Sequence, residues 1–194
     1  MNIFYLSSDP VHAARYHLDK HVVKMILESA QLLCTAHRIL DGIQTQVSKT
    51  TKSGKERSVK RYILKNPLNN ELMYSVTHIN HPCAIWCRDN INNYMWLYDL
   101  FVALCDEYTF RYGKKHKTDL MLRDILKSPP TSISHAPFTQ PAQAMPDRYK
   151  HADPIVAYQQ YYIGDKYRFA KWTKRSVPSW FKRQDYYGDA NANV

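Results

Sequence analysis

Five polar side chains within one apolar stretch recur at a spacing that could support chemistry. The stretch HLDKHVVKMILESAQ contains, in order, His17, His21, Lys24, Glu28 and Gln31. An α-helix advances about 100° per residue, so these positions fall within about 40° on either side of one line. A lysine beside a histidine and a carboxylate could act as an amine nucleophile, while Glu28 or His21 moves protons. We therefore predict a catalytic line of Lys24, Glu28, His21 and His17.

Two other interpretations of this line stay open at this level. Lys24 and Glu28 are four residues apart, which is the spacing of an ordinary ion pair on a solvated helix face. His17 and His21 have the helical spacing of two metal ligands, but no glutamate lies between them. A second set of metal-type residues matches no standard zinc finger: His78, His81, Cys83 and Cys87. We predict neither a metal site nor a cofactor.

The apolar spacing outside this stretch is mostly helical. Residues 11–40 predict one long helix or two abutting ones, and a Pro-marked helix start near residue 82 leads to a stop at Gly113. A further helix is expected over 118–127, and Asp153-Pro154 opens a final one. The N-terminal NIFYL predicts a short strand or an extended arm. The expected fold is all-α, a compact single domain over 1–194 with long loops.

Basic side chains favour a nucleic-acid partner over a merely soluble basic protein. The chain carries a formal charge of +10, and 13% of its residues are aromatic. Basic groups hold phosphates, and aromatic rings stack on bases. Residues 44–65 are strongly basic and predict a mobile insertion loop, either solvated or in contact with phosphates. The predicted partner is double-stranded DNA, and the predicted contacts are Arg57, Lys60, Arg61, Arg111, Lys114, His116, Lys117, Lys166, Lys171, Lys174 and Arg175.

Neither a secretory signal nor a membrane span is expected. The opening MNIFYLSSDP has no charged first segment and no small-residue cleavage site. No apolar run approaches the ~20 residues that a membrane span needs. The four cysteines sit in apolar helical patterns, as reduced cysteines of an intracellular protein do. We expect a cytoplasmic protein, in the host cell if a phage encodes it.

Several motifs, in order along nearly the whole chain, resemble one known family. A short apolar arm precedes HLDKHVVK, an HPCAIW segment opens a helix that ends in DEYTFRYGKKHK, and the chain closes in VPSWFKRQDYYG. In this order they resemble the pyrimidine-dimer DNA glycosylases of the phage endonuclease V type. The resemblance implies a compact all-α fold with a central groove for bent, base-flipped duplex DNA.

The resemblance also implies a mechanism, from which this chain departs at two positions. Members cut the N-glycosidic bond with the α-amine of residue 2, assisted by a Glu seven residues after the His of the His-Leu motif. Residue 2 here is Asn2, bulky enough for Met1 to be retained, and the position seven residues after His17 is Lys24. Lys24 could therefore replace the α-amine and form an imine with C1′ of the sugar.

The predicted function is a DNA glycosylase, with or without lyase activity, that acts on a flipped damaged or modified base. A base-modifying transferase on the same scaffold is one alternative, and it would leave the glycosidic bond intact. A DNA-binding protein without chemistry is another, and it would show salt-dependent binding and no turnover. A metal-dependent hydrolase that uses His17 and His21 is the most distant alternative.

Overall fold

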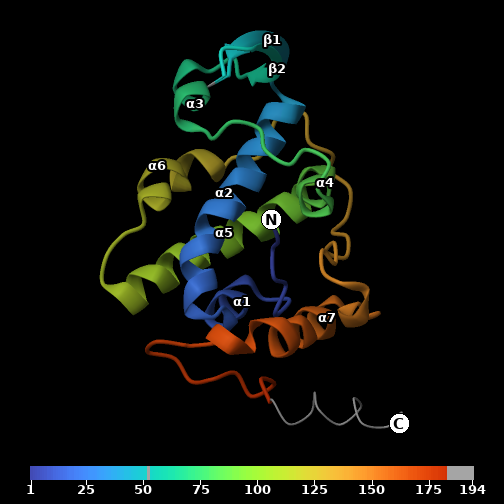
Figure 1. Ribbon diagram of the computed structural model, residues 1–194. Coiled ribbons are helices and arrows are strands. Elements are labelled where there is room, and N and C mark those ends of the chain that lie inside the picture. The colour runs from blue at the N-terminus through green and yellow to red at the C-terminus, as the bar shows by residue number, and fades with distance from the viewer. Residues whose placement is uncertain (52, 183–194) are drawn as a thin grey trace.

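Two long helices, α2 (Asp19–Leu40) and α5 (Ile91–Tyr112), cross at the centre of the molecule (Figure 1). The computed structural model describes residues 1–51 and 53–182. The predicted all-α fold is correct only at a coarser level, because the compact, mostly helical chain also contains a two-stranded antiparallel sheet. The Tyr-Tyr-Gly segment near the C-terminus lies outside the described residues.

The predicted long helix at residues 11–40 is two abutting helices. Asp9 caps α1 (Pro10–Tyr16) by accepting a hydrogen bond from the backbone N–H of His12 at 2.7 Å. The backbone is extended at His17 and Leu18, and α2 starts directly afterwards. Both residues of this break are fully buried. The break therefore turns the chain inside the core rather than at the surface.

Capping side chains set the ends of the other helices. Asn90 separates α4 (Pro82–Asp89) from α5 and accepts a hydrogen bond from the N–H of Asn93 at 2.9 Å. The predicted stop at Gly113 is confirmed, with φ of 70° in the left-handed region. The predicted helices after it are also confirmed. The remaining elements are α3 (Pro67–Leu72), α6 (Lys117–Leu126), α7 (Pro154–Tyr161), 3₁₀ turns at Asp147–Tyr149 and Tyr167–Phe169, and a π-helical turn at Tyr162–Lys166.

The basic segment predicted as a mobile loop is a β-hairpin. Strands β1 (Ile43–Thr50) and β2 (Glu56–Ile63) pair antiparallel from Ile43 opposite Ile63 to Thr50 opposite Glu56. Strand β1 alternates Ile43, Thr45 and Val47 with polar residues, which suits an extended ribbon. Gly54 supplies a left-handed residue in the turn (φ 78°). Figure 1 shows the hairpin at the end of the molecule farthest from α7.

The N-terminal residues form the predicted extended arm and no strand. Residues 2–6 are buried and belong to the central core. This core lies between α2, α5 and α4 and includes Tyr94, Leu97 and Phe101 of α5. Along the part of the chain that the structure describes, none of the helices has the length and apolar character to cross a membrane.

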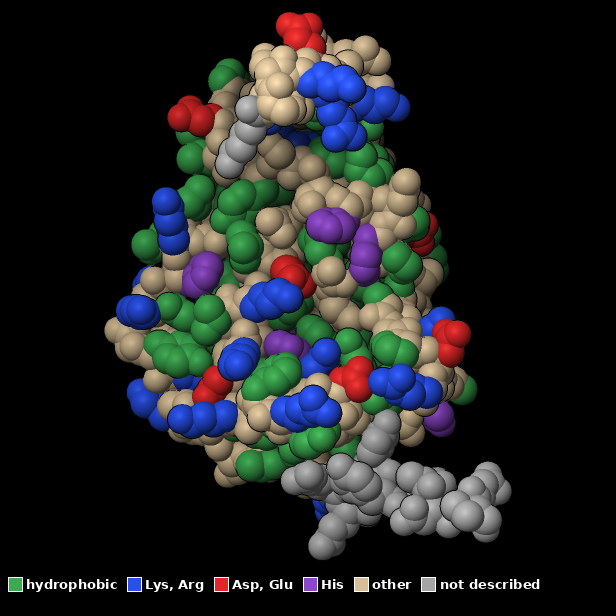
Figure 2. All heavy atoms as spheres, viewed as in Figure 1, with side chains coloured by type: hydrophobic (Ala, Val, Ile, Leu, Met, Phe, Trp, Pro, Cys, Tyr) green, Lys and Arg blue, Asp and Glu red, His purple; other side chains and the backbone are tan. Residues whose placement is uncertain are grey.

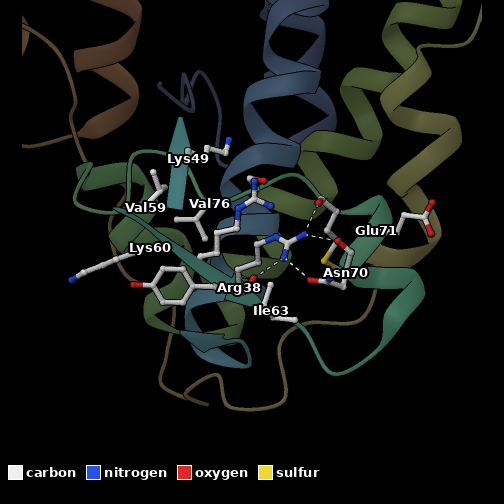
Figure 3. Close-up of a pocket in the computed structure, with 12 residues that line it drawn as sticks. Arg38, Lys49, Val59, Lys60, Ile63, Asn70, Glu71 and Val76 are labelled. Carbon is white, nitrogen blue, oxygen red and sulfur yellow. Dashed lines mark hydrogen bonds between the residues drawn. The ribbon is translucent and has the colours of Figure 1, made fainter. Parts of the chain in front are cut away.

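Arg38, near the C-terminal end of α2, ties the hairpin to the helical body (Figure 3). Its guanidinium donates five hydrogen bonds, at 2.6–3.0 Å, to the backbone oxygens of Tyr62, Asn70, Met73 and Tyr74 and to the side chain of Asn70. One planar cation thus satisfies acceptors from β2, α3 and the segment after α3. Its position fixes where the hairpin leaves the body.

We expect Arg38→Lys to lower the free energy of unfolding by about 2–4 kcal/mol. Lysine lacks the planar fork and leaves at least two of these carbonyls without a donor, and each such buried group costs about 1–3 kcal/mol. Urea denaturation measures the loss. Arg57→Lys is the matched control, because Arg57 is exposed on the hairpin and should retain wild-type stability. A loss below about 1 kcal/mol in Arg38→Lys would contradict the assigned role.

Candidate active site

The N-terminal arm contacts part of the polar face of α2, at Glu28 and His21, and the preceding His17. The backbone N–H of Asn2 donates to Glu28 Oε2 at 3.3 Å. Two residues later, the ring of Phe4 stacks on the imidazole of His21 with centroids 4.3 Å apart. The arm therefore begins beside Glu28 and continues toward the N-terminal end of α2, as Figure 1 shows.

The predicted catalytic line is consequently divided into a buried part and a surface part. The side chains of His17 and His21 are 0% and 7% exposed, so they lie in the interior. Lys24 and Glu28 remain at the surface, with side chains 67% and 13% exposed. The line is thus neither a fully solvated helix face nor one continuous surface of candidate catalytic side chains.

Glu28 is the centre of the surface part. The Nζ of Lys24 lies 3.1 Å from its Oε1, and the nitrogen of Asn2 lies 3.3 Å from its Oε2. Each carboxylate oxygen therefore has a nitrogen partner, one from a lysine and one from the start of the chain. A carboxylate within hydrogen-bond distance of an amine can take the proton that the amine loses when it attacks an electrophile. The α-amine of Met1 lies one residue away.

Asn2 fixes the start of the chain beside this carboxylate. Its side-chain amide donates to the carbonyl of Ala144 at 2.8 Å, and its Oδ1 accepts from the N–H of Ile3 at 2.8 Å. The backbone of Phe4 then adopts a left-handed conformation with φ of 46°. Aromatic residues rarely adopt this conformation, which persists only where the surroundings impose it. The arm is therefore held in one defined position.

The side chains of His17 and His21 pack against the arm in the interior, and they are not part of the surface site around Glu28. His21 Nδ1 shares a 2.6 Å hydrogen bond with the hydroxyl of Tyr162, in the π-helical turn. Burial, together with the nearby basic groups of His17, Lys166 and Lys24, lowers the pKa of His21 to about 2. Burial also lowers the pKa of His17 to about 4, and its Nδ1 lies 2.7 Å from the carbonyl oxygen of Ala13. The lowered pKa values favour the neutral imidazole at both positions, and catalytic roles for His17 and His21 stay a prediction.

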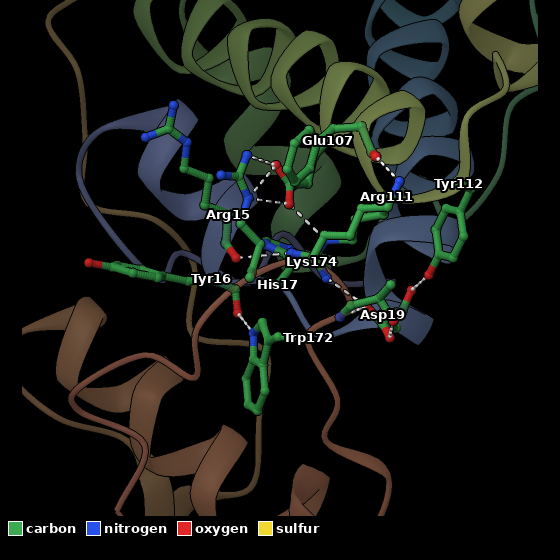
Figure 4. A network of polar contacts seen from close by, with 12 residues as sticks. Arg15, Tyr16, His17, Asp19, Glu107, Arg111, Tyr112, Trp172 and Lys174 are labelled. Atoms are coloured by element: carbon green, nitrogen blue, oxygen red, sulfur yellow. Dashed lines mark hydrogen bonds and ion pairs between the residues drawn. The ribbon is translucent and has the colours of Figure 1, made fainter.

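Arg111 is an interior residue, which corrects its predicted place in a DNA contact (Figure 4). Its side chain is 0% exposed and pairs with Glu107 at 2.7 Å and with Asp19 at 2.9 Å. Arg175 binds the other oxygen of Glu107 at 2.8 Å. Burial by itself would raise the pKa of Glu107, but hydrogen bonds from Arg175 and Arg111 outweigh it, and the pKa is lowered. This network joins α5 to the start of α2 and to the C-terminal segment.

The other predicted DNA contacts form three surface groups. The first lies on β2, the second follows α5, and the third follows α7: Arg57, Lys60 and Arg61; Lys114, His116 and Lys117; Lys166, Lys171 and Lys174. On the face in Figure 2, lysine and arginine side chains gather over the hairpin and along the opposite edge of the molecule. The side chain of His116 already accepts a hydrogen bond as the N-terminal cap of α6. Whether these groups bind DNA stays a prediction.

His81, which the sequence marks only as a metal-type residue, lies close enough to Glu28 and the N-terminal ammonium for both charges to act on its imidazole. Sequence reasoning missed two further residues that shape the site: Phe4, whose ring stacks on His21, and Tyr162, whose hydroxyl shares a hydrogen bond with it. No local pattern marks them, because they come together only in the folded chain. Asn2 had one available signal, namely that residue 2 carries the nucleophile in the family the chain resembles.

The site contains protein groups that could hold a proton or attack carbon. Within residues 1–51 and 53–182, no three His, Cys, Asp or Glu side chains gather as they would around a metal ion. The thiols are buried and free: Cys34, Cys83, Cys87 and Cys105. At the surface, the ammonium of Lys24 lies beside the carboxylate of Glu28. No protein-family model, curated protein or solved structure matches this chain when it is compared with them.

Proposed function

We propose that this protein is a DNA glycosylase that removes a flipped damaged or modified base, with Glu28 and an adjacent amine as its active centre. The observation that carries the proposal is that both Lys24 Nζ and the start of the chain lie against one carboxylate. The family that the sequence resembles uses the same pair of groups, an amine and a Glu on the first long helix. Here the Glu is one helical turn beyond the expected position.

The proposed reaction uses Lys24 as the nucleophile. The neutral form of its amine makes a bond to C1′ of the deoxyribose while the N-glycosidic bond breaks, and the base leaves with the bonding electrons and takes a proton from water. Glu28 accepts the proton that the attacking nitrogen loses. Opening of the sugar ring then gives an imine between Nζ and C1′, which water hydrolyses or borohydride reduces.

The basic groups allow a duplex to lie along α2. This helix has 22 residues and is therefore about 33 Å long, close to one turn of B-DNA. The hairpin is bound at its C-terminal end through Arg38, and the carbonyl of Lys171 accepts from Asp19 N–H at its N-terminal end. Glu28 lies between the two ends, so a duplex in contact with both would pass over it.

Borohydride trapping tests the proposal. Wild-type protein incubated with duplexes that carry damaged, modified or abasic nucleotides should form a covalent adduct, and base release should appear on at least one substrate. Lys24→Arg keeps the charge and the contact with Glu28 but is a poor nucleophile, so it should abolish the adduct. An N-terminally acetylated protein is the matched control and should still be trapped.

If Lys24→Arg is still trapped and the acetylated protein is not, the nucleophile is the α-amine of Met1, and the glycosylase reaction itself is not contradicted. EDTA should have no effect on any of these reactions, because the proposed chemistry uses protein groups alone. A complete lack of adduct and of base release across the panel would reject the glycosylase proposal.

A further inference from the structure

The β1–β2 hairpin is uncovered on both faces. Apolar side chains are exposed on it, with Ile43 at 57% and Val47 and Ile63 at 38% each. A two-stranded sheet on its own is only marginally stable in water. This ribbon is anchored at its base by Arg38 and otherwise extends away from the helices (Figures 1 and 3). Its exposed surface therefore suits a binding partner.

The charges on the hairpin indicate what that partner is. The register places Lys49 directly opposite Arg57, and Gln46 opposite Lys60. Like charges opposite one another destabilise a sheet unless an anion lies between them or over them. The described residues of the two strands include one carboxylate, Glu56. A polyanion would relieve this repulsion, whereas a second copy of the chain would add to it.

A hollow lies beside the hairpin, on the side of residues 76–81. It has a volume of about 530 Å³ and lies between β2 and residues 76–81, with Lys60 and Tyr62 on the hairpin side and His78 and His81 on the other. His81 also feels the charge of Glu28: burial chiefly lowers the pKa of His81, the N-terminal ammonium lowers it further, and Glu28 opposes the shift. Basic, aromatic and polar side chains thus line the hollow from the ribbon to His81.

We propose that the hairpin is a duplex-binding arm that lies in a groove of DNA and leads one strand across this hollow to Glu28. A two-stranded ribbon fits the major groove of B-DNA, which is about 12 Å wide. Arg57 and Arg61 share one face of the ribbon with Lys49, and Lys60 and Tyr62 lie on the other face, which borders the hollow. In this proposal Arg57 and Arg61 contact phosphates, and the hollow takes the strand that leaves the groove. The inference rests on the proposed function only for the identity of the ligand as DNA.

Removal of charge from the arm tests the proposal. Arg57→Gln/Arg61→Gln is compared with Arg57→Lys/Arg61→Lys, which keeps both charges and both side-chain lengths nearly unchanged. Fluorescence anisotropy measures the affinity for a labelled 25-base-pair duplex over a range of salt concentrations. Each lost phosphate contact lowers the salt slope by about 0.9, so the Gln variant should lose about 2 in slope. It should also bind about 10–100-fold more weakly at low salt, while the Lys variant stays within about twofold of wild type.

Three results would overturn the arm assignment. They are an unchanged slope in the Gln variant, an equal loss in the charge-conserving variant, or equal affinity for single-stranded DNA and duplex DNA. Thermal melts of both variants should match wild type, which excludes unfolding as the cause.

The failure of this inference is distinguishable from failure of the proposed function. Base release is measured with the wild-type protein, whose arm is intact, and the salt slope is compared between wild type and the Gln variant. If base release occurs while the slope is unchanged, the arm assignment alone is wrong. If the slope falls as expected and no substrate loses a base, the glycosylase proposal alone is wrong.

Discussion

A shift from pH 7 to pH 5 should cost the fold about 4 kcal/mol of unfolding free energy, through His17 and His37 alone. Both are buried, and burial lowers the pKa of each to about 4. The unfolded chain has histidines near the ordinary value of about 6.5. Each site then contributes about 2 kcal/mol of lost stability at pH 5, and the two lie near opposite ends of α2.

The direction follows from proton binding in the two states. The folded state binds fewer protons than the unfolded state between about pH 6.5 and pH 4. Stability is therefore complete above pH 6.5 and is lost as the pH falls toward 4. The pKa values of Asp19 and Glu107 are also lowered, against burial, by hydrogen bonds from Thr173 and Arg175 respectively. These carboxylates add a loss of the same sign at still lower pH.

Urea denaturation at pH 7, 6 and 5 checks this expectation. His17→Asn keeps a donor near the Ala13 carbonyl, and His37→Gln keeps a polar group near the Tyr94 hydroxyl, which His37 Nε2 contacts at 2.9 Å. Each variant should be less stable than wild type at pH 7, yet should lose about 2 kcal/mol less between pH 7 and pH 5. His135→Gln, at an exposed position, should keep the wild-type pH dependence. Identical pH dependence in all four proteins would contradict the account.

The helical part of the fold could be predicted because local signals specify it. Apolar spacing locates α2 and α5, Gly113 ends α5 in a left-handed conformation, and Asp153-Pro154 starts α7. These features act within a few residues of one another. The hairpin was missed because its lysines and arginines dominate the composition of the segment and hide the alternation that favours strands.

The sequence could predict which residues of the candidate site share one helix face, but not which of them are exposed to solvent. Which part of the line is buried depends on the arm, whose position is set by a contact between Asn2 and Ala144, 142 residues away. Arg111 was misassigned for the same reason. A basic residue at a helix end is usually solvated, but here Asp19, 92 residues distant, meets it in the interior.

Glu28→Gln should lower single-turnover base release by about 10²–10⁴-fold while the protein remains folded. Glutamine can still accept a hydrogen bond from the N–H of Asn2, which Glu28 Oε2 accepts at 3.3 Å. It cannot take a proton from an attacking amine, and general-base catalysis by one side chain contributes roughly this factor. The ion pair with Lys24 is lost as well. Because Lys24 is exposed, that pair itself contributes little to stability.

The measurement compares Glu28→Gln with Glu71→Gln, which makes the same chemical change at an exposed position on α3. Rates are measured with the enzyme in excess over a lesion-bearing duplex, so product release does not limit them. The Glu71 variant should match wild type, and DNA affinity in both variants should stay within about threefold of it. A wild-type rate in Glu28→Gln would show that another group takes the proton. Asn2 fixes the start of the chain against Glu28, and no other described carboxylate forms an ion pair with Lys24 Nζ. A wild-type rate in Glu28→Gln would therefore exclude a carboxylate as the proton acceptor, and the amine would be the one group of the proposed pair still in the mechanism.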